Sequence, residues 1–366
     1  MQWREKLKKP FDLYEVSRIR PYLMGIATLW ITLYHCKYLN LFNSSFLTRT
    51  RLLGIFTRIE ATGNCGVDLF FFLSGLGLYF SYTRLLEKDA HPMKTFYQRR
   101  YRRILPAILI VTILTFGLME AEDLAHWAGN VFLYGFYTDS LGRGNFWYLS
   151  ATVLFYLVFP LIHRAIRGRR GWIGAAAIIA VSVATALILS TAAEHYFYTH
   201  AILMIPRIPV FVLGAYMGKL CMQHRKVPVL VPLLAVPVSI LLLVLIIDVP
   251  LSPAHFRFYE FSILVPCIAL GHAYVLSKFS KRGFFTKGVM LIGSYSMEIY
   301  LLFESIYNNS VFLFHSPEDT GVVYALTAFT AALVLAVLLK MVVNQLLRVF
   351  DAQGGSVARE KEGADQ

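Results

Sequence analysis

The sequence predicts an all-α, polytopic membrane protein with ten transmembrane helices and both termini in the cytoplasm. Composition, the length of the apolar stretches and the alternation of charge between them support this. Of the 366 residues, 57% are apolar and 16% charged, with a mean hydropathy of +0.56. Globular domains average about 45–50% apolar and about 25% charged residues. This composition disfavours a soluble enzyme, a disordered protein and a disulfide-rich secreted domain.

The predicted helices are stretches of about 20 apolar residues, the length that crosses a bilayer core of about 30 Å. The first follows a basic segment without a small-residue cleavage site, which indicates a helix and not a cleaved signal peptide. In chain order the ten stretches are 22–41, 64–84, 103–119, 145–163, 172–191, 203–221, 228–248, 258–277, 288–307 and 320–342. The stretch 124–138 is apolar but short, so we expect it to be interfacial or re-entrant.

Basic residues support this count and give the orientation. The N-terminus carries six Lys and Arg, the even-numbered loops carry seven, four, three and four, and the C-terminal end carries four. Thus 28 of the 35 lie on one side, against five in the opposite loops. Lys and Arg mark cytoplasmic loops, and one helix more or fewer would scramble the pattern. Most of the net charge of +13 is then an orientation signal that requires no nucleic acid partner.

The expected organisation has three parts. Residues 1–20 form a basic cytoplasmic segment, 21–345 a ten-helix membrane domain, and 346–366 a polar cytoplasmic tail that we expect to be disordered. The cysteines have neither paired nor metal-binding spacing, which predicts free thiols and no metal. They are Cys36, Cys65, Cys221 and Cys267.

Ionisable side chains inside the predicted helices mark a candidate site, because burying them in hydrocarbon is costly. Their positions along the helices place several at one depth in the outer half of the membrane, together with a tryptophan. These residues are His35, Asp68, Trp147, Arg207, Glu260 and Glu304. An imidazole accepts a proton near neutral pH, and an adjacent carboxylate can fix its tautomer. The alternative is that these groups form interhelical hydrogen bonds that hold the bundle together.

A second candidate site lies at the start of the third helix. The segment KTFYQRRYRRILP contains Arg99, Arg100, Arg102 and Arg103. Guanidinium groups suit phosphate oxygens, so this segment could bind a phosphate ligand at the cytoplasmic face. The alternative is a strong orientation signal alone.

Six segments, taken together and in this order, resemble acyltransferase family 3, a family of integral membrane O-acyltransferases. They are YLMGIATLWITLYH ending at His35, GNCGVDLFFFLSGLGLYF (63–80), FYQRRYRRILP (96–106), FWYLSATVLFYLVFP (146–160), RIPVFVLGAYMG (207–218) and GSYSMEIYLLFE (293–304). The chain departs from the family pattern at two positions. Met24 stands where the family has Arg or Lys, and Phe303 stands where it often has His.

The resemblance implies transfer of an acyl group, usually acetyl, from cytoplasmic acyl-CoA to a hydroxyl of an exported or cell-envelope carbohydrate. No extra esterase-like domain is expected. On this interpretation His35 is the general base, and Asp68, at a similar depth and near the entry of the acceptor, is the second catalytic residue. Acyl-CoA is the donor substrate, and its phosphates bind Arg99, Arg100 and Arg103. The acceptor side is expected to comprise Trp147, Tyr156, Arg207 and Glu304.

Two other functions fit the same sequence. A transporter or flippase of lipid-linked sugars would use the outer polar cluster for binding and would need no CoA. A non-catalytic family member is suggested by the departures at Met24 and Phe303. Membrane lipids surround the protein on every interpretation, and the sequence gives no oligomeric state.

Overall fold

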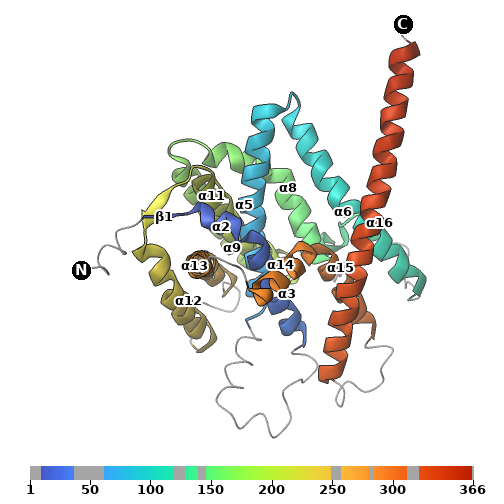
Figure 1. Cartoon of the computed structure of the whole chain (residues 1–366). Helices are drawn as coiled ribbons and strands as arrows, with labels where there is room; N and C mark the ends of the chain where they lie inside the picture. The colour runs from blue at the N-terminus through green and yellow to red at the C-terminus, as the bar shows by residue number, and fades with distance from the viewer. Residues whose placement is uncertain are drawn as a thin grey trace.

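The computed structural model describes residues 10–36, 62–118, 128–129, 131–138, 146–248, 257–279, 283–310 and 321–364. These residues form a helical bundle with one antiparallel pair of short strands (Figure 1), which confirms the all-α class. In chain order the elements are β1 (Pro10–Asp12), α2 (Tyr14–Arg18), α3 (Arg20–Cys36), α5 (Cys65–Lys88), α6 (Pro92–Leu118), η2 (Gly135–Tyr137), α8 (Trp147–Ile166), α9 (Gly171–Ala192), α10 (Glu194–Thr199), η4 (Ala201–Leu203), η5 (Ile205–Arg207), α11 (Ile208–Met222), β2 (Lys226–Pro228), α12 (Leu230–Asp248), α13 (Arg257–Ser277), α14 (Phe284–Ser294), α15 (Ser296–Ser310) and α16 (Gly321–Ala364).

Six helices of the described chain are long and apolar enough to cross a membrane. They are α5, α8, α9, the stretch Ala201–Met222, Tyr259–Ser277 of α13 and Thr327–Val349 of α16. Leu230–Ile246 of α12 and the whole of α14 are apolar but shorter. These helices support a membrane protein, while ten spans and cytoplasmic termini stay predictions.

The ninth expected helix, residues 288–307, is interrupted. α14 ends at Ser294 and α15 begins at Ser296. Lys340 of α16 donates a hydrogen bond of 2.5 Å from Nζ to the Ser294 carbonyl, and its ammonium lies 4.4 Å from the centre of the Tyr295 ring. Carbonyls at a helix end need a donor from outside the helix. The sequence pattern does not reveal this break, because the donor lies 46 residues away.

The central helix α5 is buried along most of its length and packs backbone to backbone against α11. A Cβ at Gly75 would clash with the Phe211 carbonyl oxygen, and one at Gly214 would clash with that of Phe72. Small residues permit such close approach between helices in membranes. The glycines therefore fix how near α11 comes to the centre.

Helix α3, which carries His35, meets α14 in the same way. A Cβ at Gly25 would clash with the Val289 carbonyl oxygen, and one at Gly293 with that of Pro21. Each helix thus contributes one glycine to the crossing. This contact holds the first half of α3 firmly in the bundle.

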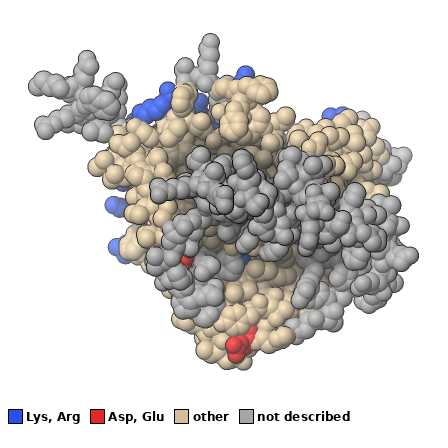
Figure 2. All heavy atoms as spheres, turned by 90° about the horizontal axis from the view of Figure 1, so that it is seen from below, with Lys and Arg blue, Asp and Glu red and all other residues tan. Residues whose placement is uncertain are grey.

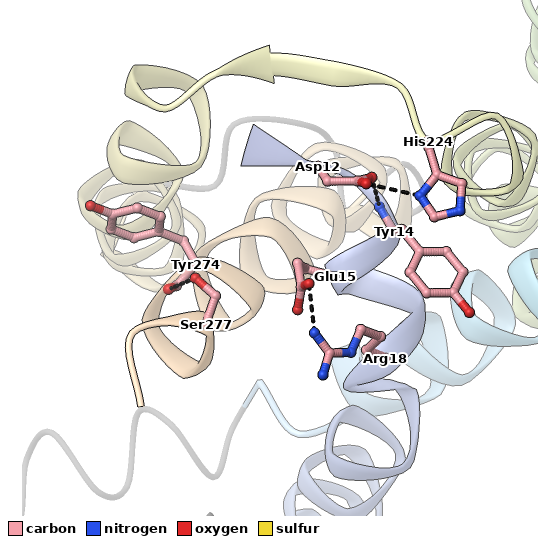
Figure 3. Close-up of polar contacts among 7 residues, drawn as sticks. All are labelled: Asp12, Tyr14, Glu15, Arg18, His224, Tyr274 and Ser277. Carbon is pink, nitrogen blue, oxygen red and sulfur yellow. Dashed lines mark hydrogen bonds and ion pairs between the residues drawn. The ribbon is translucent and has the colours of Figure 1, made fainter. Parts of the chain in front are cut away.

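The segment before α3 is part of the fold. Residues of β1 and α2 and their flanks are buried in the main core, namely Phe11, Leu13, Val16 and Ile19. The Asp12 carboxylate accepts hydrogen bonds from the Tyr14 amide (2.8 Å) and from His224 Nδ1 (2.9 Å), as Figure 3 shows. Burial raises the pKa of Asp12, but the His224 and Tyr14 hydrogen bonds lower it by more, so the pKa lies below its usual value of 3.8. The contact joins the N-terminal segment to the loop between α11 and α12.

Basic residues gather at one end of the described bundle. α5 and α11 run parallel, since Phe72 lies against Gly214 and Leu76 against Gly218, so their basic C-terminal ends lie together. Lys219 of α11 also connects to the end of α8, because its Nζ donates hydrogen bonds to the carbonyl oxygens of Ile166 and Gly168. Figure 2 looks at the opposite end, where Lys and Arg lie mainly at the margin of the described surface. The described basic residues are therefore grouped at one end of the bundle, as the alternation of Lys and Arg between the predicted loops suggests.

The last helix is longer than expected. α16 continues through the polar tail to Ala364, where the sequence predicts disorder over 346–366. Extending an existing helix costs little compared with starting one, and the Ala, Arg, Glu and Lys residues of the tail favour helix.

Candidate functional site

A cavity of about 260 Å³ lies between α3, α5, α6, α8 and α15. Its wall is made of arginines, hydroxyl-bearing side chains, aromatic rings and a few apolar groups. The lining residues are Arg20, Met24, Phe70, Ser74, Gly77, Leu78, Ser81, Arg100, Arg103, Ile104, Tyr148, Leu149, Thr152, Tyr156, Ser296, Met297 and Tyr300. None of them is acidic. Three guanidinium groups without a lining carboxylate make this cavity suited to an anion.

Arg20 lies against the backbone of α5. Its Nε donates a hydrogen bond of 3.0 Å to the Leu73 carbonyl oxygen. A Cβ at Gly77 would lie 2.8 Å from Arg20 Cζ and 2.9 Å from Nη2, so only glycine leaves room for the guanidinium. Met24, the departure from the family pattern, lines the same cavity one helical turn later. Arg20 therefore brings a positive charge to the cavity that Met24 does not supply.

The arginines of α6 divide into two groups. Arg100 donates a hydrogen bond of 2.6 Å from Nη2 to Ser81 Oγ and lies 5.9 Å from the centre of the Tyr156 ring. Arg103 also lines the cavity. Arg99 is exposed and is absent from the lining, although the sequence predicts that it binds the same phosphates. The third arginine that lines the cavity with Arg100 and Arg103 is therefore Arg20 of α3, and not Arg99.

A second, smaller cavity of about 20 Å³ lies beside His35. Its lining residues are Thr28, Ile31, Thr32, His35, Phe70, Ser296, Ile299, Tyr300 and Phe303. Phe70, Ser296 and Tyr300 also line the large cavity, so the two spaces adjoin there. The arginine-lined space therefore leads toward His35.

One face of α3 connects the two cavities. Arg20 and Met24 line the large cavity, and residues 28–35 of the same face line the small one. At 1.5 Å per residue, Arg20 and His35 lie about 22 Å apart along the helix. An extended ligand anchored at the arginines could therefore bring its other end to the histidine.

The imidazole of His35 has a defined hydrogen bond. Its Nδ1 lies 2.9 Å from the Ile31 carbonyl oxygen. A carbonyl oxygen only accepts, so in the neutral ring Nδ1 carries the hydrogen and Nε2 has the lone pair. Nε2 is then the atom that can take a proton, as a general base requires.

Asp68 pairs with Arg207. Their Oδ2 and Nε atoms are 3.4 Å apart, and the two side chains are 0% and 1% exposed. The Arg207 guanidinium also lies 5.1 Å from the centre of the Trp147 ring. None of these three residues lines either cavity. The structure thus places Asp68 in a buried cluster that joins α5, η5 and α8, whereas the sequence predicts that it acts with His35 in catalysis.

Tyr156 and Glu304 are the other two residues that the sequence predicts on the acceptor side. Tyr156, expected on the acceptor side, lines the large cavity beside Arg100. Glu304 belongs to α15, and its side chain lies outside the described residues. Sequence reasoning did not identify Thr28 and Thr32, which lie seven and three residues before His35, a spacing that itself indicates a shared helix face.

Comparison with known proteins gives the family. A family model described as an acyltransferase domain matches residues 22–341, most of the chain. The chain belongs to acyltransferase family 3. This confirms the family resemblance of the six segments. The match begins just after Arg20 and includes every other residue that lines the two cavities.

Among curated proteins, Acyltransferase MdmB of Streptomyces mycarofaciens is similar to part of the chain. The two are 31% identical over 155 residues. This region covers 36% of the chain and 37% of the relative, so the match spans little more than a third of either protein. No solved structure matches the chain.

Proposed function

We propose that this family 3 member transfers an acetyl group from cytoplasmic acetyl-CoA to a hydroxyl of an exported or cell-envelope carbohydrate. The observation that carries the proposal is the arginine-lined cavity that adjoins the small cavity of His35. The first has the positive charge that the phosphates of a donor require, and the second contains a histidine that can act as a base. The protein would lie in the cell membrane with the arginines toward the cytoplasm.

The donor phosphates bind Arg20, Arg100 and Arg103. Guanidinium groups make charge-assisted hydrogen bonds with phosphate oxygens, which are stronger than those between neutral groups. The pantetheine arm then follows the face of α3, and the thioester arrives between Phe70 and Tyr300, where the two cavities adjoin. The phosphates bind in the large cavity and the thioester points toward the small one, because arginines line only the large cavity.

His35 Nε2 takes the proton of the acceptor hydroxyl as the hydroxyl oxygen attacks the thioester carbonyl carbon. A carbon–oxygen bond forms, the carbon–sulfur bond breaks, and the thiolate leaves. The proton held on His35 then passes to the thiolate, which gives CoA and the ester. The proposed reaction uses no metal. The buried ion pair of Asp68 and Arg207 has a structural role, because it links the helices around the site.

The test in cells is ester-linked acetyl on envelope glycans. Cells expressing the native chain should carry acetyl that is absent from cells without it and from cells expressing His35→Ala. His272→Ala is the matched control, because His272 makes the same type of hydrogen bond, 2.8 Å from Nδ1 to the Ile268 carbonyl, but lines neither cavity. Equal amounts of acetyl in cells with the native chain and with His35→Ala would show that His35 is not the general base. No acetyl with any chain would count against this acceptor class.

The donor site has its own test. Arg103→Ala should weaken acetyl-CoA binding to the purified full-length protein by about tenfold, the effect of one charge-assisted hydrogen bond. Arg99→Ala is the control, since both arginines are exposed residues of α6 and only Arg103 lines the cavity. Equal losses of acetyl-CoA affinity in the two variants would indicate general attraction by a basic surface. They would contradict a specific phosphate site in the cavity.

A further inference from the structure

The small cavity restricts the space beside His35. Its volume of about 20 Å³ contrasts with about 260 Å³ for the adjoining space. A cavity needs about 10–15 Å³ by this measure to hold one water molecule, so this one accommodates a group of one or two heavy atoms. Its apolar walls are the buried side chains of Ile31, Phe70, Ile299 and Phe303.

Phe303 closes this cavity next to the base. Its ring meets the His35 ring edge to face, with centroids 6.0 Å apart, and its side chain is 4% exposed. It belongs to a buried cluster that includes Ala328 and Ala332 of α16. Close packing of this kind resists movement of a large ring, so the wall is firm.

We propose that Phe303 limits the acyl group to two or three carbons, an inference that rests on the proposed acyl transfer from CoA. The sulfur of the thioester approaches from the large cavity. The acyl chain, on the far side of the carbonyl carbon, therefore points into the small cavity. The methyl of an acetyl group fits there, whereas the two further methylenes of a butyryl group meet the Phe303 ring.

The experiment compares the binding of CoA, acetyl-CoA and butyryl-CoA to the purified full-length protein in nanodiscs. The native chain should bind butyryl-CoA at least about tenfold more weakly than acetyl-CoA, because even one misfitting methylene is worth about tenfold or more. Phe303→Ala should reduce that ratio to about twofold, and Phe303→Leu, the milder change, should give an intermediate ratio. The affinity for CoA itself should stay constant in both variants, which verifies that they are folded.

Phe285→Ala is the matched control, because this phenylalanine of α14 is 71% exposed. It should leave all three affinities as in the native chain. Equal binding of acetyl-CoA and butyryl-CoA by the native chain would overturn the size limit. An unchanged ratio in Phe303→Ala, with normal CoA affinity, would overturn the role of Phe303. Absence of CoA binding by the native chain would instead reject the proposed function, so the two failures are distinguishable.

Discussion

Arg20 and Gly77 show how one small residue can define a binding site. The guanidinium of Arg20 rests on the backbone of α5, where only glycine leaves room for it. The charge enters the cavity one helical turn before Met24, which has none. The departure at Met24 is thus compatible with a basic donor site, because Arg20 lies on the same face of α3.

Gly77→Ala should move the Arg20 guanidinium out of place while leaving every charge in the protein. We expect acetyl-CoA binding to weaken by about tenfold, the loss of roughly one charge-assisted hydrogen bond. The control is Gly288→Ala, also in a helix, where an added Cβ has open space. Binding titrations on the purified variants measure the effect, and equal affinity in Gly77→Ala and native protein would contradict the role given to Arg20.

The pair of Asp68 and Arg207 tests a structural role against a catalytic one. Asp68→Asn leaves the buried Arg207 charge uncompensated, which should cost about 3–5 kcal/mol of stability. The double variant Asp68→Asn, Arg207→Gln should recover part of that loss, since no charge stays buried. Thermal unfolding in detergent measures both.

The exposed pair of Glu15 and Arg18, 2.8 Å apart and visible in Figure 3, provides the comparison. Glu15→Gln should change stability by only about 0–1 kcal/mol. If Asp68→Asn unfolded like the native chain but lost all acyl transfer, Asp68 would be catalytic after all.

Glycines at helix crossings set the geometry at the scale of elements. Gly75 and Gly214 bring α5 and α11 together, and Gly25 and Gly293 do the same for α3 and α14. α5 and α3 carry residues that line both cavities, so the spacing of these crossings determines the width of the site. A hydropathy pattern predicts each helix but contains no information on these distances.

Gly214→Ala should force α11 away from α5, because the added methyl meets backbone and not a flexible side chain. We expect a loss of about 1–3 kcal/mol or more, as for other overpacked cores. Thermal unfolding compared with Gly288→Ala, which meets nothing, measures the effect. A stability equal to that of the control would show that the helices separate at no cost.

At the scale of the whole molecule, the described basic residues lie largely at one end, and the arginine-lined cavity belongs to that end. Arg100 of α6 reaches Ser81 near the basic end of α5, for example. Under the proposed function, the donor enters from the side that the charges mark. The positive-inside rule assigns that side to the cytoplasm.

Cysteine labelling tests this orientation. In a chain with its four native cysteines replaced, Ser140→Cys in the expected external loop should react with a membrane-impermeant maleimide on intact cells. Ser356→Cys in the C-terminal tail should react only after the membrane is permeabilised. Labelling of Ser356→Cys on intact cells would reverse the predicted topology, and labelling of neither site in permeabilised cells would show that both are covered.

The sequence by itself determined the all-α class, the long apolar helices that support a membrane protein, and the family. These follow from composition, local periodicity and short motifs, which are properties of neighbouring residues. It also predicted His35, Arg100 and Arg103 as site residues, since each belongs to such a motif, and the structure places all three in the lining of the two cavities. Arg99 shows the limit, because it has the same residue type in the same motif but is exposed outside the cavity.

Only the tertiary structure decided which of these residues meet. It paired Asp68 with Arg207, brought Arg20 into the arginine-lined cavity and placed Phe303 against His35. It also divided the ninth expected helix, with Lys340 as the donor at the break. The physical reason is common to all four. Hydropathy gives the depth of a residue along its helix, but the neighbours of a side chain depend on the rotation and spacing of helices, which contacts between distant parts of the chain set.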